Sequence, residues 1–262
     1  MSEAARLGAL GIARVRAENP SMFTLTGTNT WVLGREPAWV IDPGPALPAH
    51  LDAIVDEVDR RGGLGGVLLT HGHADHREAA APLLARRHAP LAAAHDADVL
   101  LADERRVGPL RAVATPGHAP DHFAFLYGRA CFTGDAVLGE GSVFIAPDPG
   151  ALDGYLRALR RLQGEDVELL CPGHGPPVWD AQAKLAEYID HRLDRERRLL
   201  AALRAGRRSA DELLDDAWSD VPPPLRLAAA VTLAAHLDKL ADDGLLPAGV
   251  ERPQIRLPTS GV

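Results

Sequence analysis

The chain has 262 residues, of which 46% are hydrophobic and 24% are charged, and its formal net charge at pH 7 is −8. This length suits one large domain, or one domain with a small appendage. The negative charge argues against general attraction to nucleic acid or to anionic membranes. The two cysteines, Cys131 and Cys171, stand alone, so neither a disulfide framework nor a CxxC metal site is expected. With no long apolar signal core at the start and no apolar 18-mer, we expect a cytoplasmic protein.

Strand and helix patterns alternate along residues 1–180. After a short lead, apolar and β-branched runs predict strands within 21–33 and at 38–42, 67–69, 91–94, 110–114, 123–127, 129–134 and 167–171. Helical spacing of apolar residues predicts helices at 47–61, 77–87, 96–103 and 150–163. This alternation indicates an α/β domain over 1–180.

The character of the chain changes at residue 181. A long helix is predicted over 181–205, a second from the cap Ser209 to Trp218, and a third over 225–243. Residues 250–257 suggest a β-wing. We therefore expect residues 181–262 to form a winged-helix-like helical appendage.

Three histidines and one aspartate stand close together in Thr70-His71-Gly72-His73-Ala74-Asp75-His76, after an apolar strand. This position is the carboxyl end of a strand, where α/β folds place their chemistry. In an extended loop, His71, His73 and Asp75 face one side and can converge, whereas His76 points elsewhere. One metal cannot easily take all four side chains, but two adjacent metals can.

Further polar residues stand at the ends of other strands: His118, Asp135 and His174. Imidazole and carboxylate together suit zinc, with iron or manganese as alternatives. Asp135 could bridge two cations, and a pair of cations holds a water as hydroxide at neutral pH.

Several residues near these loops keep two interpretations. Asp42 is either a turn residue or a carboxylate that orients a histidine ligand. Residues 28–30 either line a pocket or serve a turn. For His122 we favour a role in supporting the ligands, and for Tyr155 and Cys171 a role in the core.

With HxHxDH at 71–76, followed by His118, Asp135 and His174, the chain resembles the metallo-β-lactamase-fold hydrolases over about residues 20–180. The resemblance implies an αββα sandwich with two metal sites. One metal would be bound by His71, His73 and His118, and the other by Asp75, His76 and His174, with Asp135 bridging; Asp75 and Asp135 would serve catalysis.

Five further segments are similar to the β-lactamase-like protein 2 group, whose members carry a C-terminal winged-helix-like domain. They are Asn19-Pro20, 26–30, 115–122, 134–139 and 171–175. The animal member of this group is similar to a single-strand-selective endoribonuclease. The chain departs from many family members in having Arg77-Glu78, not glycines, after the signature, which affects the expected shape of the pocket floor.

These features predict a binuclear zinc hydrolase whose bridging hydroxide attacks an ester, thioester or phosphodiester, with single-stranded RNA as one substrate. The alternatives are a thioesterase of the glyoxalase II type and a non-catalytic metal-containing binding module; a β-lactamase is disfavoured.

The third helix of the appendage carries too many acidic residues to read double-stranded DNA. Seven arginines within 192–208 could contact a substrate backbone, but a solvated face with i,i+4 pairs is preferred. The appendage is expected to cover the active-site mouth or to mediate a homodimer.

Overall fold

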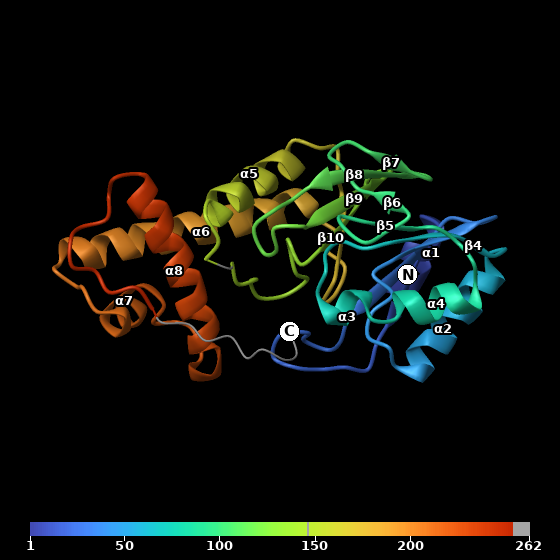
Figure 1. Cartoon of the computed structure of the whole chain (residues 1–262), viewed down its shortest axis with the longest axis horizontal. Helices are drawn as coiled ribbons and strands as arrows, with labels where there is room; N and C mark the ends of the chain where they lie inside the picture. The colour runs from blue at the N-terminus through green and yellow to red at the C-terminus, as the bar shows by residue number, and fades with distance from the viewer. Residues whose placement is uncertain (146, 254–262) are drawn as a thin grey trace.

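The computed structural model describes residues 1–145 and 147–253, and two β-sheets form its centre (Figure 1). In chain order its elements are α1 (Glu3–Ala9), β1 (Ile12–Arg16), β2 (Asn29–Leu33), β3 (Ala38–Ile41), α2 (Pro48–Arg60), β4 (Leu64–Leu68), α3 (Ala74–Arg77), α4 (Ala80–Arg86), β5 (Leu91–Ala93), β6 (Val99–Leu100), β7 (Arg106–Val107), β8 (Leu110–Ala114), β9 (Phe123–Tyr127), β10 (Ala130–Gly134), α5 (Ala151–Gln163), β11 (Leu169–Pro172), α6 (Ala181–Arg204), α7 (Ala210–Ala217), the 3₁₀ turn η1 (Pro223–Leu225) and α8 (Arg226–Asp242). One sheet has the order β1-β2-β3-β4-β5-β6 and the other β11-β10-β9-β8-β7.

Apolar side chains from both sheets fill the space between them. Successive residues of a strand point to opposite faces, so each strand gives alternate side chains to this interior. Trp31 and Leu68 of the first sheet join Phe125 and Phe132 of the second in one buried cluster. Trp31 and Phe132 meet edge to face with ring centroids 5.9 Å apart. The sheets therefore form a sandwich whose two inner faces share one core.

The outer face of each sheet is covered by helices. Val40 and Val67 of the first sheet pack against Ile54 of α2 and Leu83 of α4. On the second sheet, residues of β8 and β9 share a cluster with apolar side chains of α5 and the first half of α6. The four layers are therefore helix, sheet, sheet and helix, and the predicted αββα sandwich is confirmed.

Loops that follow parallel strands meet at one edge of this sandwich. β3, β4 and β5 run parallel to one another, and so do β10 and β11. Their carboxyl ends consequently place the segments after Ile41, Leu68, Gly134 and Pro172 at a common edge.

The long helix α6 connects two hydrophobic cores. Leu185, in its first half, belongs to the outer core of the sandwich, whereas Leu199 packs with Leu214 of α7 and Leu233 of α8 in a separate cluster. Figure 1 shows α7 and α8 standing at the far end of α6, away from the sheets. We call α7, η1, α8 and the second half of α6 the C-terminal unit. The boundary predicted at residue 180 stays a prediction, since α6 contributes to both cores.

Several local predictions were wrong. The helix expected at 96–103 is replaced by the short strand β6, which pairs in parallel with β5. The helix expected at 77–87 is two helices, α3 and α4, and the lead contains α1 and β1. Only 29–33 of the 21–33 segment is strand. Of the expected wing, 250–253 carry no strand and 254–257 lie outside the described residues.

Among the described residues, no helix combines the length and apolar character that a membrane span requires.

Candidate metal centre

The histidine-rich segment follows β4 as a short loop that turns directly into a helix. Thr70, His71 and His73 lie in the loop, and α3 begins at Ala74, so that Asp75 lies on a helical turn. The expected extended conformation is therefore wrong for the second half of the motif. The helical turn separates Asp75 from His71 and His73 and directs it elsewhere, and His76 turns inward and is fully buried.

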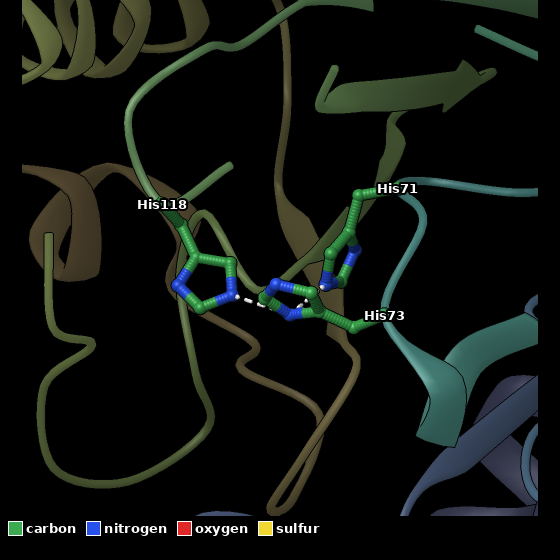
Figure 2. Close-up of side chains that lie close together, drawn as sticks. All are labelled: His71, His73 and His118. Carbon is green, nitrogen blue, oxygen red and sulfur yellow. Dashed lines mark hydrogen bonds between the residues drawn. The ribbon is translucent and has the colours of Figure 1, made fainter. Parts of the chain in front are cut away.

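The seven predicted residues all come together at the edge of the sandwich. Their potential ligand atoms form three groups, within each of which all atoms lie within 4.8 Å: His71, His73 and His118; His71, His76 and Asp135; Asp75, His76 and His174. Figure 2 shows the rings of the first group converging on one point, with His71 and His73 from the loop after β4 and His118 from the loop after β8. Two of the groups match the two sets implied by the family resemblance. Their assignment as metal ligands stays a prediction.

Asp135 lies between these two sets. Its Oδ1 is 3.4 Å from Nε2 of both His76 and His174, and its Oδ2 is 3.7 Å from Nε2 of His118. One carboxylate therefore faces ring nitrogens of both sets, which is the position that a bridging ligand would need.

Asp42 orients two of the histidines, and this decides between its two interpretations. Its Oδ2 accepts hydrogen bonds from Nδ1 of His76 (2.8 Å) and from Oγ1 of Thr70 (2.7 Å), while Oδ1 accepts from the Thr70 amide (2.8 Å). With its proton given to Asp42, the Thr70 hydroxyl accepts from Nδ1 of His71 at 2.9 Å. Both imidazoles therefore present Nε2 to the centre, the arrangement in which a carboxylate fixes the tautomer of a metal-binding histidine.

His122 contacts two residues of the centre, Asp135 and His71, and so has the supporting role that we predicted. Its Nε2 accepts the backbone N–H of Asp135 at 3.2 Å, so its Nδ1 carries the proton and donates to Oγ1 of Thr115 at 2.7 Å. Its ring also stacks on that of His71, with centroids 5.0 Å apart. His122 thus fixes the backbone that carries Asp135.

Two loop carbonyls orient two further histidines of the centre. Nδ1 of His118 donates to the carbonyl of Phe144 (3.2 Å), and Nδ1 of His174 donates to the carbonyl of Gly27 (3.5 Å). Residues 28–30 are fully buried, and the Asn29 amide donates to the carbonyls of Pro172 and Gly175. Asn29 therefore holds the loop that carries His174, and residues 28–30 do not line the cavity.

The centre has buried polar atoms that a bound cation would satisfy. Nε2 of His76 and Oδ1 of Asp135 are buried and have no hydrogen-bond partner among the described residues. A buried unpaired acceptor is costly, whereas imidazole nitrogen and carboxylate oxygen are good ligands for zinc or iron. The residues present therefore fit a pair of divalent metal ions.

The two sets of histidines also differ in charge without a metal. Burial lowers the pKa of His71 well below its ordinary value and that of His118 to about 4, so both rings are neutral and ready to coordinate. Burial also acts on His174, but Asp135 and Asp75 outweigh it and raise its pKa to about 9. Protons on this second set therefore offset the carboxylates, and a metal would have to displace them.

A cavity of about 440 Å³ opens onto the centre, and sequence reasoning missed most of its walls. His73, Asp75 and His118 line one end, together with Asp135 and His174. The other walls come from residues 22–25, from 138–144, from both halves of α6 and from the rest of the C-terminal unit. These positions carry no motif, and only the fold brings them together.

Comparisons with known proteins agree with this geometry. The family model described as "Metallo-beta-lactamase superfamily" matches residues 23–112 and 100–174, and "Beta-lactamase associated winged helix domain" matches 209–246. The chain is 37% identical to an atrochrysone carboxyl ACP thioesterase of Aspergillus chevalieri, over 75% of this chain and 67% of the relative. It is 28% identical to a beta-lactamase-like protein 2 homolog of Caenorhabditis elegans, over 90% and 85%. A beta-lactamase domain protein from Burkholderia ambifaria shares the fold with a TM-score of 0.75 at 22% identity, over 89% of this chain and 86% of that one. The chain therefore belongs to the metallo-β-lactamase superfamily of metal-dependent hydrolases.

Proposed function

We propose that the chain is a binuclear zinc hydrolase of thioesters whose acyl group has an apolar body. The observation that carries this proposal is the cavity, because its walls beyond the metal centre are mainly apolar. They include Phe23, Leu25, Leu138, Val143 and Phe144. Such walls favour an acyl chain over a sugar–phosphate backbone. The identity of 37% to a thioesterase supports the same substrate class.

The seven residues would hold the metals as two sets with Asp135 between them. Two bound cations would supply a deprotonated water as nucleophile and would polarise the thioester carbonyl. The side chains around them keep the site rigid: Asp42 fixes His76, and His122 fixes the backbone of Asp135. The carboxylate of Asp75 lines the cavity, and its side chain is 23% exposed, so it can accept a hydrogen bond from an entering water.

A single-stranded RNA substrate, the other candidate, would need unpaired cations along a groove. The arginines of 192–208 give few of these. Arg197 and Arg198 pair with Asp194, and Arg195 pairs with Asp220. Arg207 pairs with Asp216. Four of the seven arginines are therefore paired, and one of these four, Arg195, is only 4% exposed, so only part of this run forms the solvated, paired face that we preferred from the sequence.

The test is metal content per chain followed by turnover on a panel. The panel contains acyl-pantetheine thioesters, S-lactoylglutathione, a lactone, nitrocefin and a fluorogenic single-stranded RNA. We expect two zinc ions per chain and turnover of the acyl-pantetheine thioesters. Asp135→Ala should abolish that turnover and lower the metal content.

Each other result has a definite meaning. Cleavage of RNA without thioester turnover would replace the proposal with a nuclease. Turnover of S-lactoylglutathione alone would restrict it to a thioesterase of the glyoxalase II type. Iron or manganese in place of zinc would correct the metal and leave the reaction as proposed. Less than one metal per chain with no turnover would contradict a hydrolase.

A further inference from the structure

One buried arginine on the wall of the cavity has no acidic partner in the part of the chain that the structure describes. The side chain of Arg192, on α6, is 2% exposed and lines the cavity. Its Nη2 donates to the carbonyl of Val143, and its guanidinium lies over the ring of Tyr155 at 5.5 Å. Within residues 1–145 and 147–253 it forms no ion pair, and its Nε has no hydrogen-bond partner. A buried charge without a counter-charge is costly, so this position calls for an anion.

The neighbouring Arg195 shows what a structural arginine looks like in the same helix. It is 4% exposed, and it forms a two-pronged pair with Asp220, with distances of 2.5 and 2.8 Å. It also donates to the carbonyl of Ala217. The charges of Arg195 and Asp220 cancel, whereas the charge of Arg192 remains on the cavity wall.

His191 gives this wall a second donor. It lines the cavity, and its Nε2 accepts a hydrogen bond from Nε of Arg195 at 3.3 Å. Burial, with the charges of Arg192 and Arg195, lowers its pKa to about 4, so the ring is neutral at pH 7. With Nε2 accepting, the single ring proton is on Nδ1, which has no partner among the described residues and is left to donate to a ligand.

We propose that Arg192 and His191 form a binding subsite for an anionic group of the substrate, remote from the bond that is cleaved. The group is either a carboxylate at the far end of the acyl chain or a phosphate on the leaving thiol. Two donors, one of them charged, suit the oxygens of either group. This inference rests on the proposed function for the identity of the substrate, but the subsite can be tested without hydrolysis.

The test measures binding of thioethers, which lack the scissile carbonyl, to the zinc-loaded protein by calorimetry. One series is S-alkyl pantetheine of graded chain length ending in a methyl group, and a second is identical but ends in a carboxylate. A third is S-alkyl 4′-phosphopantetheine with a methyl end. At the matching length we expect one anionic series to bind roughly 10- to 100-fold more tightly than the neutral one. A preference for the second series places the anion in the acyl group, and a preference for the third places it in the leaving thiol.

Variants then test which residues cause the tighter binding of the anionic thioethers. Arg192→Met should remove it, Arg192→Lys should retain part of it, and His191→Ala should reduce it without touching the contact to Val143. Arg197→Met is the matched control, because that arginine lies on the same helix with its side chain 74% exposed, and the preference should be unchanged.

Two results would overturn the subsite. One is equal binding of all three series by the unaltered protein. The other is an Arg192→Met variant that weakens all series alike, which would make the arginine purely structural. If the anionic preference holds but no thioester is hydrolysed, the proposed reaction fails and the subsite stands.

Discussion

Asp42 shows how a single carboxylate can organise half of the metal centre. It has a φ of 49°, in the left-handed region that costs free energy for residues other than glycine. In this conformation its two oxygens reach three donors: the amide and hydroxyl of Thr70 and the ring of His76. These charge-assisted bonds offset the backbone cost and fix His76 with Nε2 toward the centre.

We predict that Asp42→Asn weakens metal binding at the set formed by Asp75, His76 and His174 by roughly 10- to 100-fold. The asparagine amide keeps the shape of the carboxylate, but its NH₂ group would face one of the three groups that donate hydrogen bonds to Asp42, and that bond would be lost. Competition with a zinc chelator would measure the loss. Asp52→Asn is the control, since this carboxylate is 64% exposed on α2. Equal affinity in both variants would show that His76 does not depend on Asp42.

Gly173 leaves room for the side chains of Asp135 and His76. A Cβ at this position would lie 2.6 Å from both Oδ1 of Asp135 and Cε1 of His76. We predict that Gly173→Ala displaces one of these side chains and lowers metal content by at least about one ion per chain, a direct effect of overpacking. Metal analysis of the purified variant would check this. In Gly8→Ala the new methyl group meets nothing within 4 Å, so the metal content should equal that of the unaltered protein. An equal metal content in Gly173→Ala would contradict the tight contact.

At this scale the sequence predicts the identity of the site residues better than their geometry. His71, His73, His118 and the rest stand in a recognisable order at strand ends, so their convergence could be foreseen. The orientation of Asp75 and His76 could not, because a helical turn begins at Ala74 and replaces the extended loop. Arg192 was counted with a solvated arginine face, since no local pattern distinguishes a buried arginine from an exposed one on an amphipathic helix.

At the scale of the elements, α8 contains a buried histidine, His236, that we expect to make the C-terminal unit less stable in acid. His236 is fully buried against Trp218, and neither ring nitrogen has a partner among the described residues. Burial, together with Arg192, Lys239, His191 and Arg195, lowers its pKa to about 3. The ring is therefore neutral in the folded protein at any pH above that value.

The sign of the pH effect follows from this lowered pKa. Between about pH 6.5 and 3 the unfolded chain binds a proton that the folded chain does not, so the free energy of unfolding falls as the pH falls. At about pH 4.5 the loss from this residue should be about 3 kcal/mol, at roughly 1.36 kcal/mol per pKa unit. We predict that His236→Leu removes this loss.

Urea unfolding at about pH 7 and at about pH 4.5 would measure this loss in the free energy of unfolding. The difference between the two pH values should shrink in His236→Leu and stay unchanged in His95→Gln, whose side chain is exposed. An undiminished pH difference in His236→Leu would mean that the buried ring is protonated in the folded state or is reached by water.

At the scale of the whole molecule, the cavity belongs to two units that the sequence presents as separate. The alternation of strands and helices and the change of character at 181 predicted an α/β domain followed by helices, and the resemblance to metallo-β-lactamase-fold hydrolases implied the sandwich. The sequence could not show that α6 would continue from one core into the other and bring α8 against the 143–145 segment, where the amide of Ile145 donates to Oγ1 of Thr232. Such packing depends on contacts between residues some 90 positions apart, and no local spacing encodes it.

Because α8 forms part of the cavity wall, the C-terminal unit should set the length of the acyl chain that fits. Ala228 lines the cavity, and a phenylalanine there would fill part of its volume of about 440 Å³. We predict that Ala228→Phe lowers kcat/KM for long-chain acyl-pantetheine thioesters by roughly 10-fold or more, through KM, while acetyl-pantetheine is turned over as before. Ala201→Phe is the matched control, since this residue is exposed on α6 and lies outside the cavity. Metal content should be equal in all three proteins. An equal loss for short and long chains would mean that the C-terminal unit supports the centre without contacting the substrate.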